Sequence, residues 1–203
     1  MTNPLGDLEI TDPRAMRALA HPVRLAILDR LIRHGAATAT QLAPHVGATP
    51  SVVSWHLRHL AEFGLVRDGE PTGDRRRRQW AAAARGFRYE SPQDAGDTEG
   101  AAAARALTSQ FFDRTAGEVR RWADQVEPGL EHEWRRLSGL SDTAVVVSGE
   151  ELTAIRQGIE ALLAPYVTRE PAQRPDGSRR VRVVRYLLPD PDVRPDAESP
   201  AGQ

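Results

Sequence analysis

The chain has 203 residues, of which 40% are hydrophobic and 27% are charged, so we expect a globular protein of one domain or two small ones. It contains no cysteine, which excludes disulfide frameworks, zinc–thiolate sites and thiol nucleophiles. No apolar run is long enough to cross a membrane, and the N-terminus lacks a signal-peptide pattern. The sequence therefore predicts a soluble, cytoplasmic protein with no membrane partner.

The charges divide unevenly along the chain. All 27 basic residues are arginine, and between residues 12 and 89 thirteen of them accompany six acidic residues. From residue 91 onward, fourteen arginines accompany nineteen acidic residues. A basic first half followed by an acidic second half favours an anion-binding module joined to a second region. Charge alone leaves open the alternative of a solvated, arginine-rich surface.

Helix start and stop signals divide the chain between residues 12 and 64. An X-Pro pair opens three of the four predicted helices, as at Thr49-Pro50, and a glycine follows three of the four. Helices are expected at residues 13–20, 22–34, 40–46 and 50–63.

Behind these helices the apolar pattern changes to that of strands. Residues 65–67 and 79–81 predict two short strands around a turn-rich segment. The two short helices before them are joined by a tight turn that contains Gly47, which is typical of a helix-turn-helix. A hairpin directly behind that unit predicts the winged form.

The rest of the chain predicts a second region with helices of its own. A long helix is expected at 101–126, where apolar residues recur every three or four positions. Ser148 and Glu151 form a capping-box pattern that opens another helix, between strand-like segments at 143–147 and 180–188. The predicted divisions are a flexible leader at 1–11, a winged helix-turn-helix domain at 12–90, a linker at 91–100, a dimerisation or effector region at 101–188 and a disordered, acidic, Pro-rich tail at 189–203.

Three stretches of the first domain resemble a known family. They are ALAHPVRLAILDRL at 18–31, QLAPHVGATPSVVSWHLRHLAEFGLV at 41–66, and the arginine-rich hairpin that ends in Trp80. Their fixed order closely resembles the ArsR family of bacterial regulators, and the later region looks like that of its longer actinobacterial branch. The resemblance implies a homodimer and, as in most members, a repressor. The fold class expected is mainly α with small β: a winged helix-turn-helix domain, a long dimerisation helix and a small strand–helix–strand region.

The helix at 50–63 carries most of the candidate DNA contacts. Its exposed side can present donors to base edges and phosphates in a major groove, and its N-terminal dipole favours a phosphate oxygen. A solvated helix face is the alternative, and for Trp55 it is packing against a neighbouring helix. His56 matches the family's histidine, which either contacts the DNA backbone or pins the turn. The other candidate contacts are Thr49, Ser51, Ser54, Trp55, Arg58 and His59.

The four arginines at 75–78 are the sharpest basic feature. Alternate residues of a hairpin face opposite ways, so only part of the run can face DNA. We expect Arg75 and Arg77 to reach the flanking minor groove or its phosphates. A strand edge guarded by charge is the alternative.

Dimerisation is expected along the helix at 101–126, because one recognition helix reads too few bases for useful specificity. Deleting residues 99–203 should therefore leave a soluble but monomeric module. The alternative that aromatic residues on this helix line a pocket for an unknown small-molecule effector stays open. The expected dimer contacts are Leu107, Phe111, Val119 and Trp122.

Neither metal binding nor catalysis is indicated. Glu131-His132-Glu133 is the one His–carboxylate cluster in the second half, and adjacent helix residues point to different faces. The chain has no nucleophile elbow and no Gly-rich phosphate loop. We therefore expect no enzyme, no cofactor and no metal.

The function expected is a sequence-specific transcriptional regulator that binds double-stranded DNA at a palindromic operator. As a homodimeric repressor it would occlude a promoter. One alternative is a winged-helix protein–protein adaptor that does not read DNA specifically. The other is a metal-responsive regulator.

Overall fold

The computed structural model describes residues 3–70, 78–89 and 96–190 of the chain. It divides into two compact units, Met1–Thr168 and Arg169–Gln203. The structure is mainly helical with few strands, as predicted. All elements described below belong to the first unit unless stated otherwise.

Four helices form at the positions that the start signals predict, each within about two residues. They are α1 (Pro13–Leu19), α2 (Pro22–His34), α3 (Ala39–Val46) and α4 (Pro50–Glu62). Side chains cap each helix: Asp12 accepts from the Arg14 amide at 2.7 Å, and Thr49 accepts from the Val52 amide at 3.4 Å. These bonds satisfy amides that the first helical turn leaves without partners.

The predicted hairpin is confirmed. Strands β2 (Val66–Asp68) and β3 (Trp80–Ala82) pair antiparallel, with Arg67 opposite Ala81. Trp80 is buried and extends the hairpin toward the helices through backbone bonds to Ala37. The hairpin is therefore anchored at its base to the helical domain.

The leader at 1–11 was expected to be flexible, and this expectation is wrong for its second half. Strand β1 (Asp7–Ile10) pairs in parallel with β4 (Gly86–Tyr89), and Ile10 is buried. A Cβ at Gly86 would lie 2.2 Å from an Asp7 carboxylate oxygen, so a larger residue there would require the Asp7 side chain to move. A strand whose partner lies almost eighty residues away gives no local turn signal.

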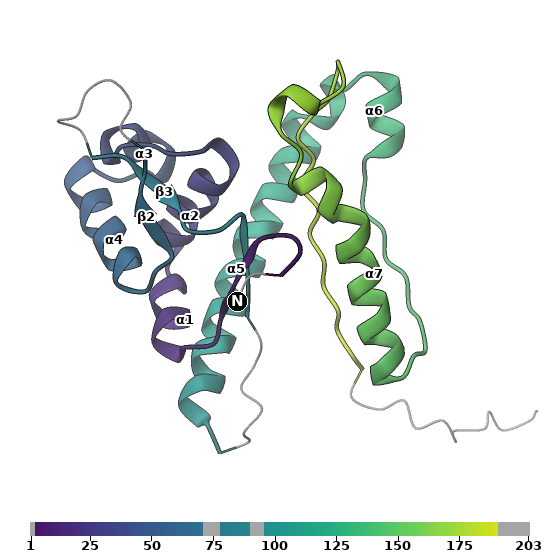
Figure 1. The fold of residues 1–203 in the computed structure, drawn as a ribbon, viewed down its shortest axis with the longest axis horizontal. Helices are drawn as coiled ribbons and strands as arrows, with labels where there is room; N and C mark the ends of the chain where they lie inside the picture. Colours follow the sequence, from purple (N-terminus) through teal and green to yellow (C-terminus); the bar gives the residue numbers. More distant parts are fainter. Residues whose placement is uncertain (1–2, 71–77, 90–95, 191–203) are drawn as a thin grey trace, which may run out of the picture. The chain divides into compact units, whose positions relative to one another are not determined.

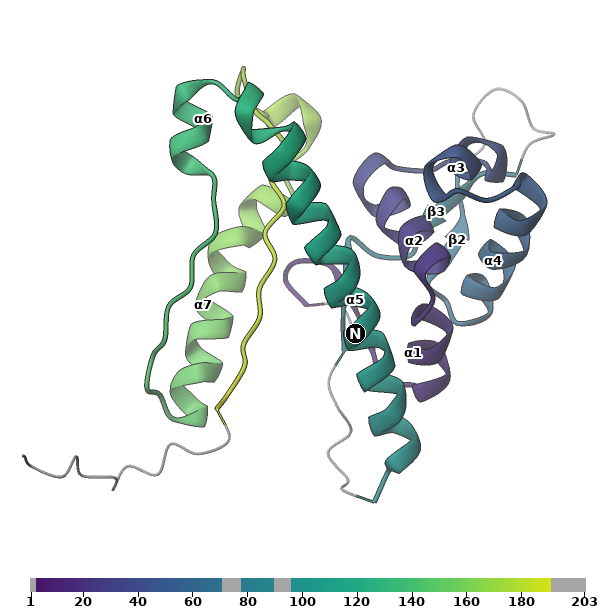
Figure 2. The same ribbon diagram turned by 180° about the vertical axis from the view of Figure 1, so that it is seen from behind.

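Helix α5 (Thr98–Gln125) begins three residues earlier than predicted, with the Asp97 side chain accepting from the Gly100 amide at 2.8 Å. Its first half lies along α1 (Figures 1 and 2). Ala103, Ala104 and Leu107 are at most 1% exposed and belong to the same core as α1–α4. The helical domain therefore extends past residue 100, and deletion from residue 99 would remove part of its core.

A network of four charged residues holds α5 to α2. Arg33 and Arg114 each bind both Asp29 and Glu118, with N–O distances between 2.6 and 2.8 Å. The four side chains are 12–30% exposed, so the charges are screened less than on an open surface. The network and the apolar contacts fix α5 on the helical domain.

After α5 the chain forms a short 3-10 turn η1 (Glu127–Gly129), α6 (His132–Leu137) and α7 (Gly149–Val167). The predicted capping box at the start of α7 is confirmed: Ser148 accepts from the Glu151 amide, and Glu151 accepts from the Ser148 amide. In the second unit, the structure places the 3-10 turn η2 (Pro171–Gln173). None of the described helices is long and apolar enough to span a membrane.

The strand predictions for 143–147 and 180–188 are wrong. Neither segment forms a strand or pairs with another described segment. A strand requires a partner for its backbone hydrogen bonds, and an alternating apolar pattern does not provide one. Val146 is 89% exposed and Val181 is 66% exposed, as expected where no second layer covers them.

Candidate nucleic-acid interface

Helix α4 separates an apolar face from a polar one. Val53, Leu57 and Leu60 are fully buried, which fixes the helix against the core. The predicted contact residues Thr49, Ser51, Trp55 and Arg58 are exposed, whereas Ser54 and His59 are half-buried. The polar face that the sequence predicts is therefore present and open to solvent.

Trp55 lies on the exposed face and not against a neighbouring helix. Its side chain is 55% exposed, and the ring stacks nearly parallel on His59 with centroids 5.6 Å apart. His59 is held in turn by Glu62, whose carboxylate lies 3.1 Å from the imidazole Nδ1. The indole is thus a large, pre-positioned apolar surface among polar groups.

His56 does not share this exposed face. It is 5% exposed, and its ring centroid lies 4.9 Å from that of His21 at the start of α2. His21 accepts from the Val23 amide at 3.2 Å and so caps α2. Burial, reinforced by His21 and Arg24, lowers the pKa of His56. Of the two roles left open for this histidine, the geometry supports the one that pins the helix-turn-helix.

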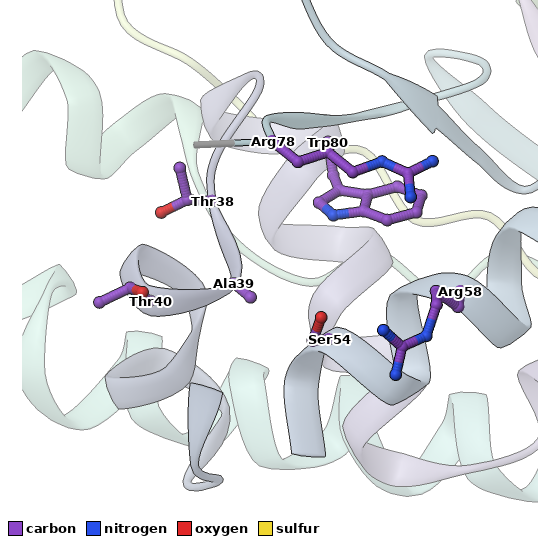
Figure 3. Close-up of a pocket in the computed structure, with 7 residues that line it drawn as sticks. All are labelled: Thr38, Ala39, Thr40, Ser54, Arg58, Arg78 and Trp80. Atoms are coloured by element: carbon purple, nitrogen blue, oxygen red, sulfur yellow. The ribbon is translucent and has the colours of Figure 1, made fainter. Parts of the chain in front are cut away.

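A cavity of about 410 Å³ lies where α3, α4 and β3 meet. Figure 3 shows the first turn of α3 on one side, Ser54 and Arg58 of α4 on another, and Arg78 with Trp80 of the hairpin above them. Hydroxyls and guanidinium groups thus line the cavity, and none of the described lining residues carries a carboxylate. The lining residues are Thr38, Ala39, Thr40, Ser54, Arg58, Arg78 and Trp80.

Arg78 is positioned by two neighbours. Its guanidinium lies 4.0 Å from the centroid of the Trp80 ring, within the range of a cation–π contact. Nε and Nη2 donate to the two Asp68 oxygens at 2.6 and 3.3 Å, and these hydrogen bonds lower the pKa of the Asp68 carboxyl. The base of the hairpin therefore holds one arginine of the run at the rim of the cavity.

Arg75 and Arg77, the two expected minor-groove contacts, lie outside the described residues. Sequence reasoning missed Thr40 and Trp80 as lining residues. A signal was present in each case: Thr40 falls in the first turn of the short helix, and Trp80 ends the arginine-rich hairpin. The sequence does not show that α3, α4 and the hairpin lie close together in the fold.

The four expected dimer residues differ in availability. Leu107 is fully buried in the chain's own core, so its assignment as a dimer contact is corrected: no second copy can reach it in this conformation. Phe111 is half-buried and packs edge-on against Phe87, with centroids 5.8 Å apart. Trp122 is half-buried and Val119 is 48% exposed, which leaves the second half of α5 open for contact.

No group of three or more histidine, aspartate or glutamate side chains is arranged to hold a metal ion within the described ranges 3–70, 78–89 and 96–190. Glu131 and Glu133 flank His132 at the start of α6, and all three are exposed.

Comparison with known proteins gives a family match within the helical domain. Residues 19–68 match a family described as a helix-turn-helix domain. No curated protein matches the chain. With the structure, the family match defines the N-terminal part as a winged helix-turn-helix domain, and this points to the class of DNA-binding regulators.

Several solved structures are similar to the chain. A "possible transcriptional regulator for arsenical resistance" is 30% identical, with 51% of this chain and 94% of that chain covered and a TM-score of 0.30. The Lactococcus lactis ZitR C30AH42A mutant in apo form is 16% identical, with 72% and 83% covered and a TM-score of 0.32. The YusO protein from Bacillus subtilis is 18% identical, with 75% and 84% covered and a TM-score of 0.31. Because these TM-scores are low, the fold assignment rests on the family match and the structure itself.

Proposed function

We propose that the protein is a sequence-specific transcriptional regulator of the ArsR type that binds double-stranded DNA as a homodimer. In this proposal it acts as a repressor by occluding a promoter, and it performs no catalysis. The observation that carries the proposal is the exposed face of α4, where Ser51, Trp55 and Arg58 project beside a cavity lined by hydroxyl and guanidinium groups.

In the proposed complex, α4 enters the major groove. Arg58 would read a guanine edge or bind a phosphate, and Trp55 would pack on a sugar or a thymine methyl group. The exposed Ser51 and Thr49 at the start of α4 would bind a phosphate near the helix N-terminus. His59 supports Trp55, and Ser54 lines the cavity.

The cavity between α3, α4 and β3 would hold a backbone phosphate. Arg58 supplies positive charge at its rim, Arg78 adds a guanidinium that Asp68 holds in place, and Thr40 supplies a hydroxyl in the first turn of α3. A phosphate there would be contacted from three elements at once, which fixes the register of the protein on the duplex. Arg75 and Arg77 remain proposed minor-groove contacts.

A second copy would double the contact with DNA. The second half of α5, including Val119 and Trp122, would form the shared surface, with Phe111 at its edge. Two recognition helices related by a two-fold axis require a palindromic operator with half-sites one or more helical turns apart.

The test is affinity for an operator selected from genomic fragments, compared with scrambled DNA at two salt concentrations. Arg58→Ala should cost about 1–3 kcal/mol at one base position if the side chain reads a guanine. Arg105→Ala is the matched control, because Arg105 is exposed on α5 away from the cavity. Equal, weak binding to both DNAs would contradict the proposal and favour a protein–protein adaptor.

A further inference from the structure

Helix α7 carries an apolar seam with the spacing of a coiled coil. Its apolar residues alternate at spacings of three and four, which places them at the a and d positions of two heptads. Ile155 is 38%, Leu162 is 72% and Tyr166 is 65% exposed, and the other two are half-buried. The seam residues are Leu152, Ile155, Ile159, Leu162 and Tyr166.

The side of α7 that packs against the rest of the chain carries a charged residue in place of a large apolar one. Within α7, all of whose residues are described, the one buried side chain is Glu160, which is 8% exposed. Its carboxylate lies 3.9 Å from Nη1 of Arg88 on β4, and Arg85 donates to the Val167 carbonyl at the end of the helix. A helix that buries a glutamate and exposes a leucine has its apolar face directed at another partner.

We propose that this seam pairs with α7 of a second copy of the chain as a short parallel coiled coil. The inference rests on the proposed homodimer and extends it beyond α5. If Leu152 is an a position, Glu151 is the preceding g position and Arg156 is the following e position. In a parallel pair, a g residue faces the e residue five positions further along the partner, so Glu151 meets Arg156 of the second copy on both sides of the seam.

The charged residues beside the seam favour a second copy of α7 as its partner and a parallel orientation of the two helices. In an antiparallel pair a faces d, g faces g and e faces e, so the register that overlaps the seam brings Glu151 near Pro165 and Arg156 near Arg156 of the second copy and forms no ion pair. Ion pairs between the two copies therefore form only when the two α7 helices are parallel. Because two heptads bury less than the roughly 1,200 Å² of a stable interface, this contact adds to the α5 surface and does not replace it.

The chain has no cysteine, so single cysteines in the full-length protein report the pairing directly. A disulfide needs Cα atoms about 4.4–6.8 Å apart, which equal a positions satisfy across a parallel seam. Leu152→Cys and Tyr166→Cys should each form a self-cross-linked dimer under mild oxidation. Gln157→Cys, an exposed f position on the far side of α7, is the control and should remain uncross-linked.

Each outcome is informative. Cross-linking only in a mixture of Leu152→Cys with Leu162→Cys, an a and a d position that face each other in an antiparallel pair, would show that arrangement and overturn the proposal. No cross-linking at either position, in a protein that sediments as a dimer, would also overturn it and leave the α5 dimer intact. A monomer in sedimentation would remove the homodimer of the proposed function itself.

A charge in the seam provides the second test. Leu162→Glu should raise the dimer Kd about tenfold or more, since two carboxylates would face each other in an apolar layer. Gln157→Glu adds the same charge outside the seam and should leave the Kd unchanged. If both variants change the Kd equally, the seam does not lie at the interface.

Discussion

The substitution Leu107→Ala tests whether the first half of α5 belongs to the core of the helical domain. Leu107 is fully buried in the cluster that α1–α4 form. Alanine removes three carbons, at about 0.8 kcal/mol for each buried methylene, and leaves a cavity, so the loss in the free energy of unfolding should be about 2–5 kcal/mol. For a chain of this size that corresponds to a fall in Tm of about 5–20 °C.

Urea unfolding followed by circular dichroism measures this loss, with the slope m checked for constancy between variants. Leu137→Ala is the matched control: the same substitution is made in a helix, at a side chain that is 73% exposed, and should change stability by less than about 0.5 kcal/mol. Equal small effects for the two variants would refute the assignment of α5 to the core. Such a result would indicate that the helical domain ends before residue 99.

Three further predictions follow from individual contacts. Because burial lowers the pKa of His56 and His21, the folded state binds fewer protons than the unfolded chain, whose histidines titrate near pH ~6.5; stability should be full above that pH and fall below it. Urea unfolding from pH ~7.5 to ~5.5 checks this, and the decline should be shallower for His56→Gln; an identical pH dependence would contradict the assigned cause. Arg114→Met should lower the free energy of unfolding by about 1–3 kcal/mol, because Asp29 and Glu118 would then share one arginine. In thermal melts, the difference from the unsubstituted protein should shrink at high salt. No difference at low salt would show that the network contributes nothing to stability. Thr38→Ala removes the capping box of α3 and should cost about 1–2 kcal/mol in urea unfolding, whereas Thr38→Ser should stay near the unsubstituted protein; equal losses would assign the effect to the methyl group.

Local signals predicted the local structure well. The caps at Asp12 and Thr49 depend on residues two or three positions away, so a short window of sequence contains all that is needed. The β1–β4 ladder was missed because its two strands are distant in sequence and each has only four residues. The strand patterns at 143–147 and 180–188 failed for the related reason that a pattern does not supply a partner.

Apolar periodicity identifies a face but not what covers it. Leu107 and Val119 lie on one predicted seam, yet Leu107 packs inside the chain and Val119 is 48% exposed. The burial of His56 could have been predicted, because it lies three residues after Val53 and four before Leu60, on the buried stripe of α4. The cavity could not, because Thr40, Arg58 and Arg78 come from three elements that meet only in the fold.

The most direct test of the account is the affinity of the protein for a selected genomic operator and for scrambled DNA, each measured at two salt concentrations. The account predicts a palindromic site bound on the order of a thousandfold or more above scramble, with affinity falling steeply as salt rises. Equal, weak affinities for the two DNAs would contradict it, because charge attraction alone would then explain all binding to α4 and the hairpin.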